Sequence, residues 1–492
     1  MFAYGVQTHP NNNHQKTLFL IFASMNIEYS EEELLVLKKI AAAAKIIDVD
    51  SYVIGGYVRD KILGRNTKDI DVVCVGDGIA LAEETAKQFG KDVQVNIFKT
   101  YGTAQIKMDE TEIEFVGARK ESYSFESRNP LVEKGTLEDD QLRRDFTINA
   151  MGISLNEADF GKLNDPFDGL GDIERQLIKT PREPEQTFID DPLRMMRAIR
   201  FAAQLQFTIE TNTLAAITAN AKRIKIITKE RIAEELNKIL LCNKPSVGFD
   251  LLYKTGLLEI IFPQMTALAG AEVLDGYGHK DNFYHTLQVV DNISETTDDL
   301  WLRWAAVLHD IAKPATKKFE EGHGWTFHGH EAVGGRMVPK IFTQLKLPQN
   351  DKMKFVRKMV EMHLRPISLT KENITDSAIR RLLFDAGEDI DSLMKLCDAD
   401  ITSKNKQKVK RFLENFEMVR VRCAEVEATD NLRNWQPPIT GEIIMDTFNL
   451  GPSKEVGIIK DFIRNAILDG EIPNNFEAAH AYMLKKGAAL FG

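Results

Sequence analysis

The feature that most constrains the fold is a change in hydrophobic pattern about one third of the way along the chain. Between residues 51 and 116, short β-type runs (SYVIGG, DIDVVCV, DVQVNIF, GTAQIKM and TEIEFVGA) alternate with helical runs. This alternation predicts a small mixed sheet with flanking helices. After about residue 175 the strand signals almost vanish, and helical periodicity dominates the remainder. We therefore expect an α/β head followed by an all-α remainder.

The length of 492 residues predicts two to four domains. Clusters of Pro and Gly near residues 243–247, 275–278 and 436–441 mark candidate boundaries. The expected parts are an N-terminal extension (1–28), an α/β head (29–175), an all-α neck (176–270), a second all-α domain (271–430) and a C-terminal helical tail (431–492).

Three local expectations refine this division. Residues 1–24 are expected to be poorly ordered or to precede the true start, because Met25 leads into a typical charged helix. Residues 31–46 have the spacing of an amphipathic helix. The polar stretch from 120 to 142 is expected to be a long loop, and a loop of that length inside a compact domain is usually functional or mobile.

Composition excludes several classes of protein. No apolar run approaches the roughly 20 residues that a membrane-spanning helix needs. The four cysteines are scattered without CxxC pairing, which fits a reducing cytoplasm. A net charge of -10 counts against broad non-specific binding of nucleic acid, although it leaves room for a local basic track. We expect a cytoplasmic protein with no membrane and no DNA as partner.

Two carboxylates stand two residues apart in the run Asp-Ile-Asp-Val. Alternate residues of a strand point to the same face, so Asp69 and Asp71 are expected side by side. Ile70 and Val72 then face the other way. Two carboxylates this close repel each other unless a cation lies between them, and Mg²⁺ prefers carboxylate and phosphate oxygens. A pair of Mg²⁺ ions there can activate an attacking hydroxyl and stabilise a pyrophosphate leaving group.

Candidate phosphate-binding groups precede and follow this pair in the sequence. Gly55 and Gly56 end a strand directly before a helix, where exposed backbone N–H groups can cradle a phosphate. Arg59 lies one turn into that helix. Arg143 and Arg144 follow the polar stretch, and guanidinium groups bind phosphate oxygens in a fork. Together these segments predict a site for a nucleoside triphosphate.

The window from Gly55 to Asp71 combines GG, RD, LG and DxD elements within 17 residues. It resembles the signature of the polymerase-β-type nucleotidyltransferases, specifically the bacterial branch of CCA-adding enzymes and poly(A) polymerases. The resemblance implies a third carboxylate on a neighbouring strand, five positions before an arginine. Glu114 and Arg119 match this spacing, and Glu112 stays open as an alternative.

The run that begins at Arg143 reads RRDFTINAM and resembles the family's nucleotide-binding motif. The resemblance implies that Asp145 and the preceding arginines contact the ribose and phosphates of the nucleotide. Asn149 belongs to the same motif and is included among the expected nucleotide-binding residues.

The segment Asp-Asp-Pro-Leu-Arg at 190–194 resembles the family's EDxxR motif. A carboxylate and a guanidinium placed together can read the Watson–Crick edge of a base, which implies this role for Asp191 and Arg194. We expect these two residues and Arg197 on one helical face. Arg200 completes the expected nucleotide-binding set, and Asp190 departs from the family's usual glutamate.

Histidine and aspartate residues recur in the second half in the order His, His-Asp, Asp. Both residue types are good ligands for divalent metals, and the order resembles that of the HD-domain phosphohydrolases. The all-α domain at 271–430 is therefore expected to be an HD domain. The resemblance implies an unspecified divalent metal held by His285, His309, Asp310 and Asp400, with Asp398 competing for the last position, and a second metal supported by His330 and His363.

A basic segment follows the last of these aspartates. Such a run can track an RNA backbone by charge, although a solvated helix face explains the pattern equally well. The candidate RNA-binding residues are Lys404, Lys406, Lys408, Lys410 and Arg411.

The leading hypothesis is a Mg²⁺-dependent CCA tRNA nucleotidyltransferase that takes tRNA, CTP and ATP as partners. Poly(A) polymerase is a close alternative, but the basic element typical of those enzymes after the metal strand is missing from VQVNIFKTYGTAQIKM, and the chain is acidic. An A-adding or CC-adding enzyme of the same branch stays open. Two hypotheses of other classes are an HD phosphohydrolase with a nucleotide-binding head and a non-enzymatic RNA-binding protein.

Overall fold

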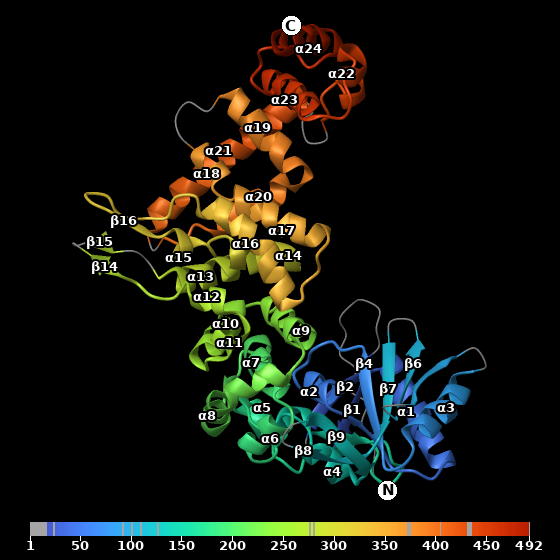
Figure 1. Cartoon of the computed structure of the whole chain (residues 1–492). Coiled ribbons are helices and arrows are strands. Elements are labelled where there is room, and N and C mark those ends of the chain that lie inside the picture. Colours follow the sequence, from blue (N-terminus) through green and yellow to red (C-terminus); the bar gives the residue numbers. More distant parts are fainter. Residues whose placement is uncertain are drawn as a thin grey trace. The chain divides into compact units, whose positions relative to one another are not determined.

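The computed structural model describes residues 17–22, 25–90, 93–99, 102–108, 111–124, 127–274, 277–278, 281–370, 375–403, 405–430 and 435–491. The chain divides into two compact units (Figure 1). The first comprises Met1–Thr228 and Lys254–Ile260, and the second comprises Lys229–Tyr253 and Ile261–Gly492. This division falls inside the predicted neck, and the predicted boundaries at 175, 270 and 430 stay predictions.

The first unit contains the strands and helices that precede Thr228. Its strands are β1 (Thr17–Phe22), β2 (Met25–Ser30), β3 (Ser51–Ile54), β4 (Asp69–Cys74), β5 (Val95–Phe98), β6 (Thr103–Met108), β7 (Thr111–Gly117), β8 (Arg119–Ser124), β9 (Ser127–Lys134), β10 (Gly152–Ser154), β11 (Leu163–Asn164), β12 (Leu177–Ile178) and β13 (Thr208–Ile209). Its helices are α1 (Glu31–Ile46), α2 (Gly56–Ile62), α3 (Gly78–Phe89), α4 (Leu137–Leu142), α5 (Gly169–Glu174), α6 (Pro184–Asp190), α7 (Leu193–Leu205) and α8 (Thr211–Asn220).

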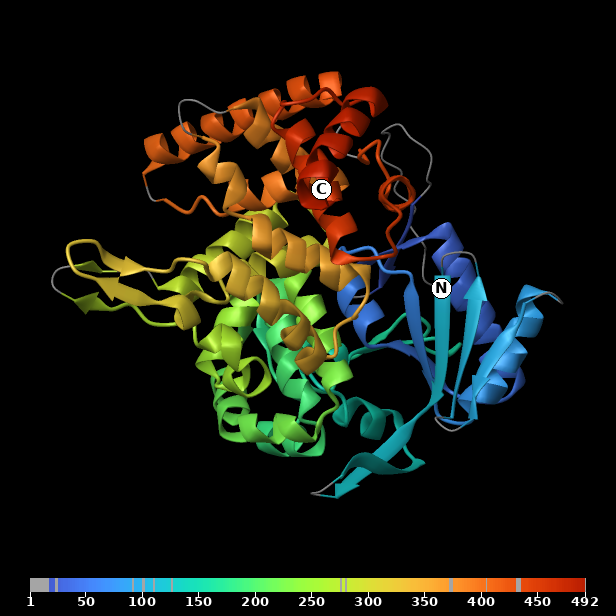
Figure 2. The same ribbon diagram turned by 45° about the horizontal axis from the view of Figure 1, so that its top comes forward.

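A mixed seven-stranded sheet in the order β11-β10-β3-β4-β7-β6-β5 is the framework of this unit. β4 and β7 pair in parallel, and the other neighbours pair antiparallel. α3 packs against β6 and β7, and α1 packs against α3 (Figure 2). The predicted small mixed sheet with flanking helices is therefore confirmed.

The predicted helix at 31–46 is confirmed with the same bounds. It begins with a capping box, in which Glu33 N donates to Ser30 Oγ at 3.1 Å and Ser30 N donates to Glu33 Oε2 at 2.8 Å. Leu34, Leu37 and Ile40 are buried at helical spacing.

Within the extension expected at 1–28, β2 pairs antiparallel with β1, and residues 1–16 lie outside the description, so the extension stays a prediction. One expectation for the first unit is wrong. The expected loop at 120–142 is mostly the hairpin β8–β9 followed by α4. A two-stranded ribbon is held by its backbone ladder and has open edges, so it tolerates Pro130 and needs no apolar alternation.

The second unit is helical, as predicted, apart from short hairpins. Its helices are α9 (Lys229–Leu240), α10 (Pro245–Lys254), α12 (Pro263–Thr266), α13 (Asn282–Ser294), α14 (Leu300–Leu308), α15 (Lys313–Thr316), α16 (His330–Leu345), α17 (Asp351–Met362), α18 (Arg365–Ser368), α19 (Asp376–Ala386), α20 (Ile390–Ala399), α21 (Lys406–Asp430), α22 (Gly441–Phe448), α23 (Lys454–Leu468) and α24 (Phe476–Phe491). The intervening α11 (Leu257–Ile261) belongs to the first unit except for its last residue. The hairpins are β14 (Val273–Leu274) with β15 (Tyr277–Gly278), and β16 (Lys318–Glu320) with β17 (Gly324–Thr326).

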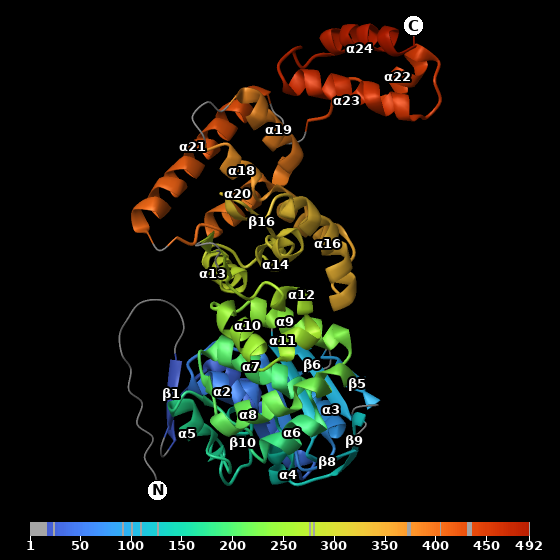
Figure 3. The same ribbon diagram turned by 60° about the vertical axis from the view of Figure 1, so that its left-hand side comes forward.

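The core of the second unit is formed by α13, α14, α17 and α20, which pack against one another. Trp304 and Phe283 are fully buried within it. Near the C-terminus α23 and α24 lie side by side (Figure 3). Among the described residues, no helix is both long enough and apolar enough to span a membrane.

Candidate active site and candidate metal centre

The expected carboxylates lie on two neighbouring parallel strands. In the register of β4 and β7, Asp69 is paired with Glu112 and Asp71 with Glu114. Ile70, between the two aspartates, is buried in the core. The i, i+2 pattern predicted for β4 therefore holds, and it extends across the strand pair.

The two candidates for the third carboxylate differ in their partners. Lys107 Nζ lies 2.7 Å from Glu112 Oε1, and Gln105 Nε2 lies 3.2 Å from Glu112 Oε2. Glu114 is paired directly with Asp71, and its charge acts on that residue. Because Lys107 and Gln105 of β6 bind the carboxylate of Glu112, the geometry favours Glu114 as the third carboxylate of the site.

Asp71 is the most perturbed acid of this group. Burial raises its pKa to about 6, with Glu114 and Asp69 adding repulsion, although Arg144 and Arg59 act in the opposite direction. A carboxylate in this position is protonated more readily than usual because its negative charge is incompletely balanced. The cluster therefore has the donor atoms and the charge imbalance of a cation site.

Gly55 lies where any side chain would intrude on the site. Its φ is +83°, and a Cβ there would lie 2.8 Å from Arg144 Nη1 and 3.2 Å from Asp71 Oδ2. Only glycine adopts this backbone conformation without strain and leaves this space open. Gly56 begins α2 directly after it, so the predicted glycine turn before a helix is present.

Arg59 begins a chain of buried polar contacts. Its Nη1 donates to Asn149 Oδ1 at 2.6 Å, and Asn149 Nδ2 donates to Asp145 Oδ1 at 3.0 Å. Arg197 Nε donates to Asp145 Oδ2 at 2.7 Å. Burial alone would raise the pKa of Asp145, but Arg197, Asn149 and Arg194 outweigh it and lower the value to about 2. These four predicted residues form one network with an ionised carboxylate at its centre.

Arg143 and Arg144 are held by a residue that the sequence patterns did not single out. Asp140 has no exposed surface, and its two carboxylate oxygens bind one arginine each. The spacing of i+3 and i+4 along a helix is the signal that predicts such contacts. Because residues 120–142 are polar, the sequence pattern predicted a loop there and not the helix that provides this spacing.

The predicted helical face at 191–197 is wrong in one respect. Asp191 has extended backbone geometry between α6 and α7, because the residue before a proline is disfavoured in the helical region. Its carboxylate accepts from Leu193 N at 3.1 Å. Arg194 is buried, and its Nη2 donates to the Arg143 carbonyl at 2.7 Å. Its Nη1 has no hydrogen-bond partner within the described part of the chain.

Phe201 is surrounded by three of the predicted arginines. The guanidinium carbon of Arg200 lies 4.0 Å from the ring centroid, that of Arg59 5.0 Å and that of Arg197 5.5 Å. Cation–π attraction and the nearby Asp145 offset the repulsion among these cations. Asp190, which departs from the family's usual glutamate, forms an ion pair with Arg182.

The second constellation is assembled entirely within the second unit. His285 Nε2 lies 2.9 Å from Asp400 Oδ1 and 3.4 Å from Asp310 Oδ2, while His309 Nε2 lies 3.2 Å from Asp310 Oδ2. On the other side, His330 Nε2 lies 3.2 Å from Asp310 Oδ1 and 3.3 Å from His363 Nε2. Two groups with metal-ligand spacing therefore share Asp310: His285 with His309, and His330 with His363.

Backbone carbonyls orient three of these rings. The Nδ1 atoms of His309, His330 and His363 lie 2.7, 2.8 and 2.7 Å from carbonyl oxygens three residues earlier. Such contacts favour a proton on Nδ1 and leave Nε2 available as a ligand atom. His309 Nε2 is buried without a well-directed hydrogen bond among the described residues, which fits a ligand atom for a metal. Asp310 Oδ2 forms an ion pair with Lys313 Nζ at 2.5 Å.

The electrostatics of the cluster point the same way. Burial alone would lower the pKa of His309, but Asp310 and Asp400 raise it to about 10. Burial, aided by the charge of His309, lowers the pKa of His363 to about 4. In the metal-free protein Lys313, whose Nζ lies 2.5 Å from Asp310 Oδ2, and a proton on His309 together compensate the carboxylates. A divalent ion can supply the charge of the His309 proton.

The competing aspartates are separated by their contacts. Asp400 approaches His285, whereas Asp398 pairs with Arg420 on α21. The geometry therefore favours Asp400 as the ligand.

The predicted RNA-binding residues are placed at the start of α21. Lys406, Lys408, Lys410 and Arg411 are exposed there, and Lys404 lies outside the described residues. Lys410 Nζ lies 3.8 Å from Glu414 Oε1, a long and exposed ion pair. The segment is therefore an exposed basic start of a helix. This placement is compatible with RNA binding and equally with a solvated helix face.

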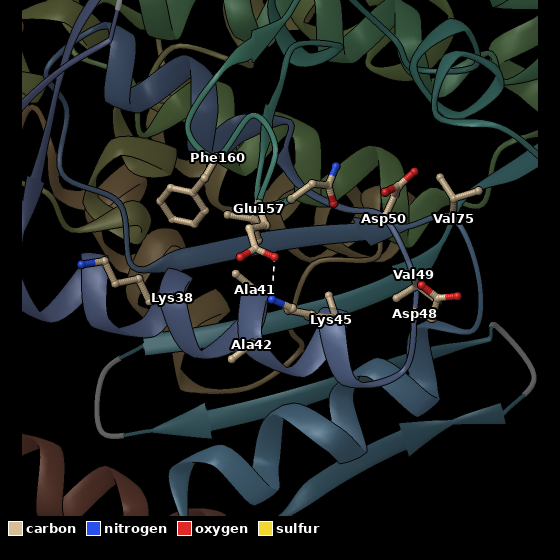
Figure 4. A pocket seen from close by; sticks show the side chains of 13 residues that line it. Lys38, Ala41, Ala42, Lys45, Asp48, Val49, Asp50, Val75, Glu157 and Phe160 are labelled. Atoms are coloured by element: carbon tan, nitrogen blue, oxygen red, sulfur yellow. Dashed lines mark hydrogen bonds and ion pairs between the residues drawn. The ribbon is translucent and has the colours of Figure 1, made fainter. Parts of the chain in front are cut away.

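A cavity of about 650 Å³ opens elsewhere in the first unit, between α1 and the connection from β10 to β11 (Figure 4). Lys45 and Glu157 form an ion pair of 2.5 Å within it. Val75, which follows β4, places the cavity at the opposite end of that strand from Asp69. None of the predicted site residues lines it.

Comparison with known proteins divides the chain into three matched regions. Residues 51–179 match the "Poly A polymerase head domain" family. Residues 206–268 match the family described as "Probable RNA and SrmB- binding site of polymerase A". Residues 282–405 match the HD domain family.

Individual relatives agree with these families. The chain is 31% identical over 370 residues to the Multifunctional CCA protein of Shewanella denitrificans, covering 72% of this chain and 84% of the relative. It is 40% identical over 192 residues to the A-adding tRNA nucleotidyltransferase of Aquifex aeolicus, covering 39% of this chain and 23% of the relative. The Bacillus stearothermophilus CCA-adding enzyme in complex with CTP has the same fold, with a TM-score of 0.65 at 23% identity over 93% of this chain and 98% of that chain.

The resemblance found in the sequence motifs is therefore confirmed. The chain belongs to the family of CCA-adding tRNA nucleotidyltransferases and poly(A) polymerases, and it carries an HD domain.

Proposed function

We propose that this chain adds C, C and A to the 3′ end of tRNA in the cytoplasm, from CTP and ATP, with release of pyrophosphate and without a nucleic-acid template. The observation that carries the proposal is the pairing of Asp71 with Glu114, beside Asp69 and opposite Arg144. The likeness over most of its length to a relative named Multifunctional CCA protein supports this product.

Asp69, Asp71 and Glu114 fit Mg²⁺, because they provide the carboxylate oxygens that this ion prefers and an imperfectly balanced charge. Bound there, Mg²⁺ supplies charge stabilisation for the attacking 3′ hydroxyl and the leaving pyrophosphate. The protein's own contribution is orientation of the nucleotide. Arg143 and Arg144 grip the phosphates.

The remaining nucleotide-binding residues act on the ribose and the base. Asp145 stays ionised at the centre of a hydrogen-bonded network beside the phosphates. The other members of this network are Arg59, Asn149 and Arg197. Asp191 and Arg194 select the base by hydrogen bonding. Among the described residues Arg194 Nη1 has no hydrogen-bond partner, so it can donate to the base. Arg200 stabilises the arrangement through Phe201.

tRNAs whose 3′ ends represent successive stages of CCA addition distinguish this proposal from its close alternatives. The purified chain is incubated with tRNA that lacks CCA, tRNA ending in C and tRNA ending in CC, each with labelled CTP or ATP. Addition of C, C and then A supports the proposal. Extension of the CC-ending substrate alone indicates an A-adding enzyme, of the kind found in Aquifex aeolicus. Long A tails would indicate a poly(A) polymerase and overturn the proposal.

The affinity of the carboxylate site for Mg²⁺ is expected to fall below about pH 6, by up to about tenfold per pH unit, because Asp71 must lose a proton to bind a cation. In the metal-free protein Asp71 keeps its proton between pH 3.8 and about 6, where the unfolded chain has lost it. The contribution of protonated Asp71 to the free energy of unfolding is therefore lost as the pH rises from 3.8 to about 6.

The measurement is the Mg²⁺ concentration that gives half-maximal incorporation at pH 5.5 and 7.5. Asp145, with its pKa of about 2, stays ionised across this range, so its interactions in the nucleotide site should not change with pH. We therefore expect the KM for CTP at saturating Mg²⁺ to change little. An equal Mg²⁺ requirement at both pH values would contradict the prediction.

We further propose that the HD domain hydrolyses phosphoesters with a divalent metal. His285, His309, Asp310 and Asp400 would hold one ion, and His330 and His363 would support a second. Such an ion activates water for attack on phosphorus. The chemistry of tRNA ends makes a 2′,3′-cyclic phosphate or a 2′-nucleotide the expected substrate. The exposed cations Lys406, Lys408, Lys410 and Arg411, which follow Asp400 in the chain, would guide the RNA backbone.

A further inference from the structure

A buried carboxylate connects the two arginines of the nucleotide site. Asp140 Oδ1 accepts from Arg143 Nε at 2.9 Å and from Arg143 Nη2 at 2.5 Å. Its Oδ2 accepts from Arg144 Nε at 3.2 Å and from Arg144 Nη2 at 3.1 Å. Each arginine is thus held by two N–H groups, which fixes the plane of its guanidinium as well as its position.

This attachment decides which part of Arg144 faces the site. Arg144 uses Nε and Nη2 on Asp140, so Nη1 is directed away from that carboxylate. Nη1 lies 2.8 Å from the position that a Cβ on Gly55 would occupy. The same position lies 3.2 Å from Asp71 Oδ2. The outer edge of the guanidinium is therefore presented between the glycine turn and the catalytic carboxylate.

The helix that carries Asp140 is anchored on both sides. Thr136 and Asp139 form a capping box at its start. Gln141, which is 1% exposed, donates to the Ala150 carbonyl at 2.7 Å and to the Asn164 carbonyl at 3.3 Å. These bonds attach α4 to the segments around β10 and β11. A support this rigid holds the side chains built on it in one geometry.

We propose that Asp140 is a positioning residue of the nucleotide site, which aligns Arg143 and Arg144 to grip the triphosphate of the incoming CTP or ATP. This inference rests on the proposed function. Asp140 faces the arginines, and we assign it no contact with the nucleotide. Its single negative charge lets two guanidinium groups lie together and leaves them a net positive charge for phosphate. Without it, two partly buried cations would repel each other and turn towards solvent.

The test is equilibrium binding of CTP and CMP to the full chain with Asp140→Asn. Loss of the aligned clamp is expected to weaken CTP binding about tenfold or more, which corresponds to losing one charge-assisted contact to phosphate. CMP, which lacks the two outer phosphates, is expected to bind as it does to the wild type, and tRNA affinity is expected to stay unchanged. Equal weakening of CTP and CMP would overturn the proposal, as would unchanged CTP binding.

Asp172→Asn is the matched control. Asp172 is also a buried carboxylate of the first unit, where it accepts from Thr147 Oγ1 at 2.6 Å and from Arg175 Nη2 at 2.7 Å. Its loss removes a buried charge without touching Arg143 or Arg144. We expect its ratio of CTP to CMP affinity to match that of the wild type.

A double variant keeps the test decisive if Asp140→Asn fails to fold. Asp140→Asn combined with Arg143→Gln leaves one guanidinium for one amide oxygen, which relieves the charge imbalance. This double variant should bind CTP several-fold more weakly than Arg143→Gln alone, because the uncharged amide oxygen holds Arg144 without charge assistance. Equal affinities would overturn the proposal. A wild type that binds CTP without extending tRNA would instead contradict the proposed function.

Discussion

Asp69→Ala is expected to abolish the incorporation of C and A into tRNA, with a fall of about a thousandfold or more. Metal-supplied charge stabilisation contributes several kcal/mol, and each step of about 1.4 kcal/mol corresponds to a factor of ten. Asp69 lies one pleat from Asp71 on β4, so its removal leaves the cation site incomplete. Incorporation of labelled CTP and ATP into tRNA lacking its terminus provides the measurement.

Two control variants locate this effect. His309→Ala should leave incorporation largely intact, because His309 belongs to the second unit and its HD cluster. Glu112→Gln should retain far more activity than Glu114→Gln, because Glu112 is paired with Lys107. Full activity in Asp69→Ala would show that the carboxylates of β4 have been assigned wrongly.

Asp310→Ala is expected to remove divalent metal from the HD domain and to abolish hydrolysis of 2′,3′-cyclic phosphates. Asp310 is 2% exposed and faces both histidine groups, with His285 at 3.4 Å from one oxygen and His330 at 3.2 Å from the other. Asp400 lies 2.9 Å from His285, but among the described residues Asp310 alone belongs to both histidine groups. Metal content after dialysis, measured by mass spectrometry, and conversion of the 2′,3′-cyclic phosphate to an acyclic phosphomonoester are the two readouts.

Asp398→Ala and Asp400→Ala form a matched pair for this experiment. Asp400 approaches His285 at 2.9 Å, so its loss should lower metal content. Asp398 pairs with Arg420 and should be dispensable for the metal. All three variants should retain CCA addition, which verifies that the first unit is folded. Wild-type metal content in Asp310→Ala would be incompatible with the proposed centre.

The sequence predicted the framework of the head because its strands have one strongly buried face. Ile70, Val72, Ile113 and Phe115 are all buried, and their alternation with polar residues is visible in the sequence. The same alternation placed Asp69 and Asp71 on one face. The position of β7 between β4 and β6 brings Lys107 to Glu112 and so favours Glu114 as the third carboxylate. This strand order could not be obtained from the pattern.

Features that lack an apolar pattern escaped prediction. The hairpin β8–β9 is stabilised by pairing between backbones, and α4 is a short helix whose start resembles a polar loop. Asp140 was therefore overlooked, although its spacing to Arg143 and Arg144 suits a helix. The extended geometry of Asp191 could have been anticipated from Pro192 alone. The sharing of Asp310 by two histidine groups is a tertiary arrangement that no local rule specifies.

The separation of the two constellations has a consequence for how lineages of this protein can change. Asp69, Asp71 and Arg144 lie in the first compact unit, and the complete set of histidines and aspartates lies in the second. Neither set borrows a ligand from the other. A substitution that disables one chemistry can therefore be inherited without erasing the other, so selection can act on each independently. Descendants that keep nucleotide addition while their histidines drift to other residues are an expected outcome of this architecture.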